Sequence, residues 1–145
     1  MNYKDWTIPR LKELPQLEKA LDNIPERIKT LEAEYTNIRA ARADAAPVHG
    51  GTNTREEVLV ANIAEREELS ARYDIARRNV EQMRNALADL EPNERKALEM
   101  FYIHRCKNHV ERLCNEFGYE KSQVYAIKDE ALIKLAKILY GCAEL

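Results

Sequence analysis

The chain has 145 residues, with 23 basic and 25 acidic side chains and a formal net charge of −2 at pH 7. This length suits one domain, or a small domain on a helical extension, and leaves little material for a large enzyme. Only four Gly and five Pro, with 33% charged residues, are typical of a charged, helix-rich protein. No apolar run approaches the roughly 20 residues of a membrane span, and the first residues lack the apolar core of a signal peptide. We therefore expect a cytoplasmic protein that does not cross a membrane.

An apolar heptad pattern starts near Leu14. The apolar residues recur at alternating steps of three and four, namely Leu14, Leu17, Leu21, Ile24, Ile28, Leu31, Tyr35 and Ile38. This spacing predicts a long helix with a coiled-coil seam. Pro25 interrupts the seam, because proline inside a helix removes a backbone hydrogen bond. The segment "LDNIPERI" predicts either a kink at Pro25 or a break, with Asn23 capping a new helix, in preference to a straight rod.

A second long helix should follow the loop segment "AAPVHGGTNT". Thr54 and Glu57 form a capping-box pattern, which predicts a helix beginning near Arg55. Its seam consists of Leu69, Tyr73, Ala76, Val80, Met83, Leu87 and Leu90. Earlier positions in the same register are polar, at Asn62 and Arg66. We expect the half nearest the loop to pack more loosely, or to pair differently, than the half nearest Leu90.

Two seams joined by a short loop predict an antiparallel helical hairpin over residues 1–89. Heptads with polar flanks also allow helices of different chains to pair. A stripe of two apolar positions per heptad is thin for an isolated pair of helices. We therefore expect a homodimer through the N-terminal helices, and the alternative is a monomeric hairpin that leans on the C-terminal domain.

Residues 90–145 predict a separate helical domain. Glu91-Pro92-Asn93 interrupts the second seam, and proline in a first turn starts a third helix. The apolar face of this helix holds Ala97, Leu98, Phe101 and Tyr102. The segment "CKNHV" makes a corner, which is followed by a short helix at 110–117 and a long helix at 121–139.

The last two helices satisfy the steric requirements of a helix-turn-helix. The side chains expected to face the third helix are Leu113, Phe117, Tyr119, Val124 and Ile127. Cys114 is small where the second helix passes closest, and Gly118 occupies a corner that needs positive φ. The predicted fold is therefore all-α: a long, coiled-coil-like N-terminal helical hairpin followed by a C-terminal three-helix helix-turn-helix bundle.

The segment "LEPNERKALEMFYIHRCKNHVERLCNEFGYEKSQVYAIKDEALIKL" resembles the fourth conserved region of bacterial sigma factors. The matching positions are Leu90, Arg95, Leu98, Tyr102, Val110, Leu113, Phe117, Gly118, Val124, Ile127, Ala131, Leu132 and Leu135. With a helical N-terminal half containing "RAARADAAPVHGGT", the whole chain is similar to small phage and prophage regulators of the RinA and ArpU type, which activate late or packaging genes. The resemblance covers the C-terminal third by motif and the remainder only by layout.

This resemblance implies a protein that binds double-stranded DNA, with the helix at 121–139 in the major groove. Matching the apolar frame places Lys121, Ser122, Tyr125 and Ala126 where sigma factors reach base edges. Helical periodicity also puts Lys121, Ser122 and Tyr125 on one outward face, since Val124 and Ile127 point inward. Gln123 and Lys128 lie beside them and could bond phosphates.

The charge balance and the cysteines leave alternatives open. Residues 90–145 carry nine basic and nine acidic side chains, whereas phosphate neutralisation normally supplies most affinity for DNA. The alternatives are a sigma-like or antiterminator-like protein that binds RNA polymerase or RNA, and a small terminase-like packaging component. We expect no enzyme and no cofactor, since no nucleophile–base pair or phosphate loop has meaningful spacing. His104, Cys106, His109 and Cys114 could be drawn as a zinc site, but turn and core roles are favoured and no metal is predicted.

Overall fold

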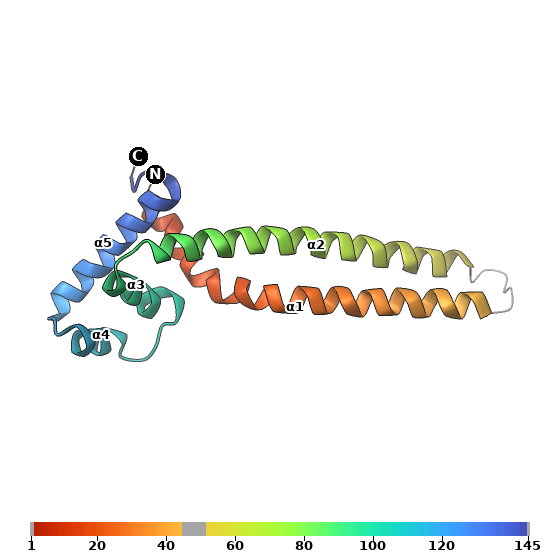
Figure 1. Cartoon of the computed structure of the whole chain (residues 1–145), viewed down its shortest axis with the longest axis horizontal. Helices are drawn as coiled ribbons and strands as arrows, with labels where there is room; N and C mark the ends of the chain where they lie inside the picture. Colours follow the sequence, from red (N-terminus) through yellow and green to blue (C-terminus); the bar gives the residue numbers. More distant parts are fainter. Residues whose placement is uncertain (1, 45–51, 145) are drawn as a thin grey trace. The chain divides into compact units, whose positions relative to one another are not determined.

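The computed structural model describes the backbone of residues 2–44 and 52–144 and the side chains of residues 2–41 and 54–144. The helices are α1 (Tyr3–Asp44), α2 (Thr52–Ala88), α3 (Pro92–Leu98), α4 (His109–Phe117) and α5 (Lys121–Tyr140), and a π-helical turn, η1 (Glu99–Ile103), continues α3. Figure 1 shows their order along the chain. Apart from one bridge between Asn2 and Glu144, the described residues contain no β-structure, so the all-α prediction is confirmed. None of these helices is long and apolar enough to cross a membrane.

The chain divides into two compact units. The terminal unit combines Met1–Glu18 with Arg78–Leu145, and the helical-pair unit comprises Lys19–Arg77. This division differs from the predicted boundary after residue 89. The reason is that the first turns of α1 pack with the C-terminal helices, where Thr7 and Leu11 are fully buried.

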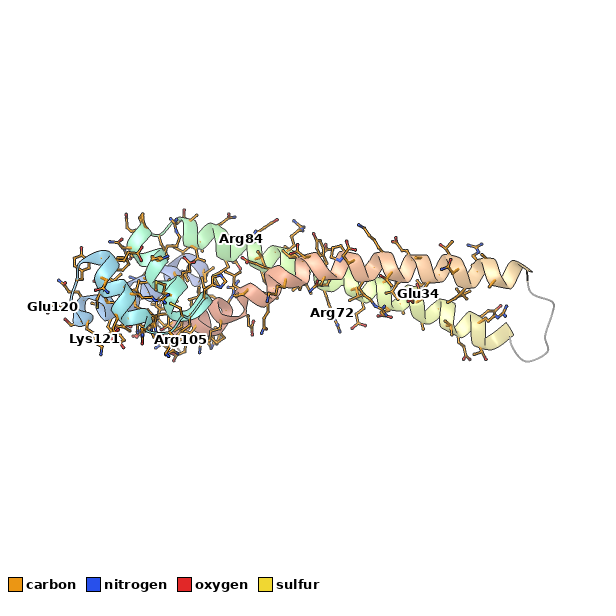
Figure 2. The ribbon with its side chains drawn as sticks, turned by 90° about the horizontal axis from the view of Figure 1, so that it is seen from below. Glu34, Arg72, Arg84, Arg105, Glu120 and Lys121 are labelled. Atoms are coloured by element: carbon orange, nitrogen blue, oxygen red, sulfur yellow. The ribbon has the colours of Figure 1, made fainter. Side chains whose placement is uncertain are left out.

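In the helical-pair unit, α1 and α2 run antiparallel along the predicted seams. Arg27 Nη2 lies 3.2 Å from Glu65 Oε1, and Asn62 Nδ2 donates a 2.9 Å hydrogen bond to the Leu31 carbonyl. Leu31 and Leu59 are buried on this seam, and Leu21, Ile24 and Ile28 of α1 are half-buried. Charged side chains such as Glu34 and Arg72 are exposed on the outer surfaces of the two helices (Figure 2).

Asn62 is the polar interruption that the heptad pattern indicated. Its side chain is only 6% exposed. While its amide donates to Leu31, its Oδ1 accepts a 2.9 Å hydrogen bond from Arg66 Nε, and the Arg66 guanidinium lies 5.2 Å from the Tyr35 ring centre. The seam here therefore pairs through hydrogen bonds and a cation–π contact instead of apolar packing.

Two predicted helix starts are wrong, namely the break at Pro25, which was one of the two alternatives there, and the cap at Thr54. The helical backbone continues from Tyr3 to Asp44 without a break, so Asn23 does not cap a new helix at Pro25. Ile24 and Ile28 flank Pro25 on the half-buried seam, and the helix continues through the proline although its nitrogen cannot donate a hydrogen bond. Helix α2 begins at Thr52, so Thr54 lies within its first turn and is not the cap. The loop was predicted over residues 45–54; residues 52–54 belong to α2, and residues 45–51 lie outside the described residues.

In the terminal unit the two ends of the chain lie together (Figure 1). The Tyr3 amide donates a 2.9 Å hydrogen bond to the Ala143 carbonyl, and the Tyr3 ring stacks on Tyr140 with centroids 5.0 Å apart. Arg10 donates to the Tyr140 hydroxyl at 3.3 Å and to Gln82 Oε1 at 2.7 Å. The start of α1 is thereby joined to the end of α5 and to α2.

Helix α3 holds the remaining helices of this unit together. Arg95 Nε donates to the Leu87 carbonyl at 3.0 Å and Arg95 Nη2 to the Leu90 carbonyl at 3.1 Å, so Arg95 ties α3 to the end of α2. The buried Glu94 carboxylate accepts from Lys134 of α5 at 3.0 Å and from the Glu91 amide at 3.2 Å. The bond from Lys134 orients α5 against α3, and the bond from Glu91 caps the start of α3.

Candidate nucleic-acid interface

The turn between α4 and α5 sets the direction in which α5 leaves the core. Gly118 adopts φ 71° and ψ 27°, as the sequence predicted, and its amide donates to the Cys114 carbonyl at 2.9 Å. A Cβ on Gly118 would meet no atom within 4 Å, so positive φ and not crowding requires glycine there. Helix α5 then starts at Lys121, and Val124 N donates to the Glu120 carbonyl at 3.1 Å.

An apolar cluster anchors the N-terminal half of α5. Met100, Phe101, Leu113 and Val124 are buried in it, and half-buried side chains pack around them, namely Tyr102, Cys106, Val110, Cys114 and Phe117. Tyr119 was expected to face this core, and that prediction is wrong. Its side chain is 42% exposed, because the left-handed turn at Gly118 carries it outward. Its ring meets the Phe117 ring edge-on, with centroids 6.3 Å apart.

The six predicted interface residues do not share one environment. Lys121, Ser122, Gln123 and Ala126 are exposed on α5. Tyr125 is 40% exposed, and its ring meets Phe101 edge-on with centroids 5.6 Å apart. The surface of the first two turns of α5 therefore carries a cation, small polar groups and an aromatic ring held by the core.

Lys128 is the exception. Its side chain is 16% exposed, its amine lies 5.5 Å from the Phe101 ring centre, and it pairs with Asp129 at 2.7 Å. Burial lowers the pKa of this amine, but the bond to Asp129 and the nearby Tyr102 hydroxyl more than offset that, so the pKa is raised. Lys128 thus supports the aromatic core and presents less of its charge to solvent than Lys121.

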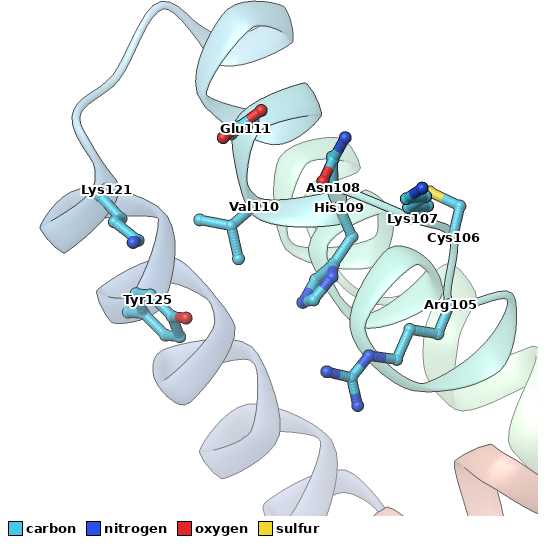
Figure 3. A pocket seen from close by; sticks show the side chains of 9 residues that line it. All are labelled: Arg105, Cys106, Lys107, Asn108, His109, Val110, Glu111, Lys121 and Tyr125. Atoms are coloured by element: carbon cyan, nitrogen blue, oxygen red, sulfur yellow. The ribbon is translucent and has the colours of Figure 1, made fainter.

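A cleft of about 410 Å³ opens beside the start of α5 (Figure 3). One wall is the corner and first turn of α4, and the other is Lys121 and Tyr125 of α5. Figure 3 shows the Arg105 and His109 side chains directed toward the same space as Lys121 and Tyr125. The remaining lining residues are Cys106, Lys107, Asn108, Val110 and Glu111.

The charges in this cleft are mostly unneutralised. In the part of the chain that the structure describes, Arg105, Lys107 and Lys121 form no ion pair, and Glu111 is the one acidic lining residue. Both α4 and α5 begin here without a side-chain hydrogen bond to their first amides. The positive ends of the two helix dipoles favour an anion at this position.

Sequence reasoning missed Arg105, Lys107, Asn108 and His109 as interface candidates. The signal was present as the basic segment "HRCKNH", which was interpreted as a corner and as part of a disfavoured zinc site. Asn108 adopts φ 59°, a left-handed conformation that Asn tolerates better than most residues, and it turns the chain into α4. This turn sets the cationic residues of the corner opposite α5.

The four residues considered for zinc do not assemble a site. Across the described side chains, no three His, Cys, Asp or Glu groups lie together in a metal-binding arrangement. His109 lines the cleft, whereas His104 lines a different hollow with Leu14 and Arg95. Cys106 and Cys114 pack instead against the apolar cluster.

No family model matches this chain, and comparisons with curated proteins and with solved structures return no match.

Proposed function

We propose that this protein is a DNA-binding transcription regulator whose α4 and α5 act as a helix-turn-helix, with α5 in the major groove. The observation that carries the proposal is the cleft of unpaired cations directly beside the exposed N-terminal turns of α5. A B-DNA major groove about 12 Å wide admits one α-helix, and such helices contact base edges through their N-terminal residues. The resemblance to sigma factors and to RinA- and ArpU-type regulators extends the proposal to phage or prophage late or packaging genes.

The two parts of the surface have different roles in this proposal. Lys121, Ser122 and Tyr125 contact base edges, because a lysine donates to guanine acceptors and a tyrosine ring contacts a thymine methyl. Arg105 and Lys107 contact phosphates, which position the protein without specifying sequence. Lys128 contributes mainly by holding Tyr125, since its amine lies 5.6 Å from the Tyr125 ring centre.

Residues 90–145 carry no net charge, but several of their cations lie together in the cleft. Lys134 is paired with Glu94 and Lys128 with Asp129, whereas Arg105, Lys107 and Lys121 are not paired within the described residues. Few phosphate contacts per copy still mean weak binding by one copy, because each neutralised phosphate adds to the affinity.

We propose that two copies bind together through the helical-pair unit. Val60, Ile63 and Ile75 are exposed on α2, with 65%, 38% and 54% of their surfaces accessible. Their helical spacing places them away from the buried seam, where a second copy would cover them. A dimer raises the affinity because binding of the second copy becomes intramolecular. Sedimentation of the purified protein, compared with a Val60→Glu and Ile63→Glu double variant, tests this pairing.

Selection of bound sequences from random duplex DNA tests the proposed function. We expect the full-length protein to enrich one motif and Lys121→Ala or Tyr125→Ala to weaken or change it. Lys137→Ala is the matched control, because Lys137 is an exposed lysine near the opposite end of the same helix. Arg105→Ala and Lys107→Ala should each weaken binding to all DNA sequences alike. Each should also reduce the slope of log affinity against log salt concentration by about 0.9.

Two results would count against this proposal. If no sequence is enriched even at low ionic strength, direct DNA reading is wrong, and RNA polymerase or RNA becomes the better candidate partner. If a motif is enriched but survives both α5 substitutions, a different surface reads the bases.

A further inference from the structure

His109 occupies an unusual position in the cationic cleft. It is the first residue of α4, it lines the cleft, and its ring is half-buried. The ring meets Phe101 edge-on, with centroids 4.7 Å apart and an interplanar angle of 86°. Because Phe101 belongs to the buried cluster, this contact packs the imidazole against the core at the edge of the cleft.

The charged and titratable groups around His109 are predominantly cationic. They come from the corner, from α4, from α5 and from the far side of Phe101, and they are Arg105, Cys106, Lys107, Glu111, Lys121, Tyr125 and Lys128. A proton on the imidazole would add a further positive charge at a helix N-terminus, where the dipole disfavours cations. Glu111 is the only carboxylate that lines this cleft among the described residues.

These surroundings favour the neutral form of His109. Burial lowers the pKa of His109, and the charge of Arg105 lowers it further, while a backbone hydrogen bond at Cys106 partly opposes them. The neutral imidazole is therefore favoured in the free protein, although it lies in a cleft whose cations attract anions.

We infer that the cleft binds one phosphate group of a polyanion together with one proton on His109. A phosphate held by Arg105 and Lys107 beside His109 reverses the sign of the local field, and imidazolium then becomes a donor to the phosphate instead of a repelled cation. The inference rests on the proposed function for the identity of the polyanion, which is the DNA backbone. The proton uptake itself follows from the cleft and applies to any phosphate that enters it.

Proton uptake makes binding depend on pH in one direction. Since the pKa of His109 is higher in the complex than in the free protein, affinity is highest below both pKa values. It falls as pH rises from the pKa of the free protein to that of the complex, by at most tenfold per pH unit, and is constant above both. A difference of one pKa unit between the two states corresponds to a total change of about tenfold.

The test follows the His109 ring signals by NMR from pH 5 to 8.5. Spectra are recorded for the full chain alone, with saturating inorganic tripolyphosphate, and with a mixed-sequence 20-base-pair duplex. We expect either anion to raise the His109 pKa, while the ring signals of His104, which lines the other hollow, respond little to the added anion. In parallel, duplex affinity is measured at pH 5.5 and 8 for the wild type and for variants.

The variants separate the proton from the packing of the ring. His109→Gln should bind duplex like the wild type at pH 8 and lose most of the gain at pH 5.5. His109→Lys should bind at pH 8 with the higher affinity that the wild type reaches only at pH 5.5. His104→Gln should keep the wild-type pH dependence, and circular dichroism checks that each variant is folded.

The outcomes distinguish this inference from the proposed function. If tripolyphosphate raises the His109 pKa but no duplex binds, the DNA proposal fails and the proton-coupled phosphate site stands. If duplex binds while the His109 pKa does not move, or if His109→Gln keeps the wild-type pH dependence, the inference is overturned and the DNA proposal stands. If neither anion binds or moves the pKa, both are wrong.

Discussion

Replacing Gly118 by alanine is expected to destabilise the terminal unit by about 1–2 kcal/mol. Gly118 has φ 71° and ψ 27°, which lies in the left-handed helical region. An L-residue in that region is less stable by about 1–2 kcal/mol, because its Cβ approaches a carbonyl oxygen of its own backbone. The surroundings add nothing to this cost, since a Cβ at Gly118 meets no atom within 4 Å.

The single tryptophan provides the assay. Trp6 lies in the terminal unit and contacts the rings of Tyr3 and Tyr140, so its fluorescence reports the unfolding of that unit. With a urea dependence of about 2 kcal/mol per molar, the Gly118→Ala midpoint should fall by about 0.5–1 M. Gly118→Asn should lose less stability than Gly118→Ala, because asparagine tolerates a left-handed backbone better than alanine does.

Gly141→Ala is the matched comparison, because Gly141 ends α5 with φ 80° and a Cβ added to it would likewise meet no atom within 4 Å. An unchanged midpoint in Gly118→Ala would refute the left-handed turn between α4 and α5. A loss well above about 3 kcal/mol would show instead that neighbouring atoms crowd Gly118, contrary to the open space found there.

Three further substitutions test the packing. Leu113→Ala should lower the free energy of unfolding by about 2–5 kcal/mol, because Leu113 is fully buried in the cluster under α5; urea unfolding followed by Trp6 fluorescence measures this. Tyr119→Ala should change it by less than about 1 kcal/mol, and by less than Phe117→Ala in the same assay, since Tyr119 is exposed and Phe117 packs on the cluster. Asn62→Leu should leave thermal stability equal or higher by circular dichroism but broaden the distribution of oligomers by sedimentation, because a buried polar seam residue specifies register and partner number.

Local periodicity predicted much of the helical structure. The seam residues of α2 from Ala76 to Leu90 are buried, and α4 and α5 begin and end within one residue of the expected positions. The left-handed Gly118 was also predictable, because a tight turn between two helices demands a conformation that glycine adopts without strain. These features depend on residues that are close along the chain.

The features that sequence reasoning missed depend on distant residues. The first turns of α1 are helical because Leu11 and Thr7 are buried in the terminal unit, which no local cap signals. The cleft arises from the juxtaposition of a corner with the start of α5, and each segment alone has the pattern of a solvated basic stretch. Tyr119 was misplaced because an aromatic residue in a motif suggests burial, whereas one left-handed residue before it reverses its direction.

The joining of the two chain ends has a consequence for the order of folding. Arg10 and Tyr140 are 130 positions apart, whereas Asn62 and Leu31 are separated by 31. On a ribosome, the helical-pair unit can therefore form while the partners of Tyr3 and Arg10 are still unsynthesised. An antiparallel pair brings its own two ends together, so its early formation shortens the loop that remains to be closed. Trp6 would consequently reach its final surroundings last, and its fluorescence in refolding experiments would follow the slow closing step and not the pairing of α1 with α2.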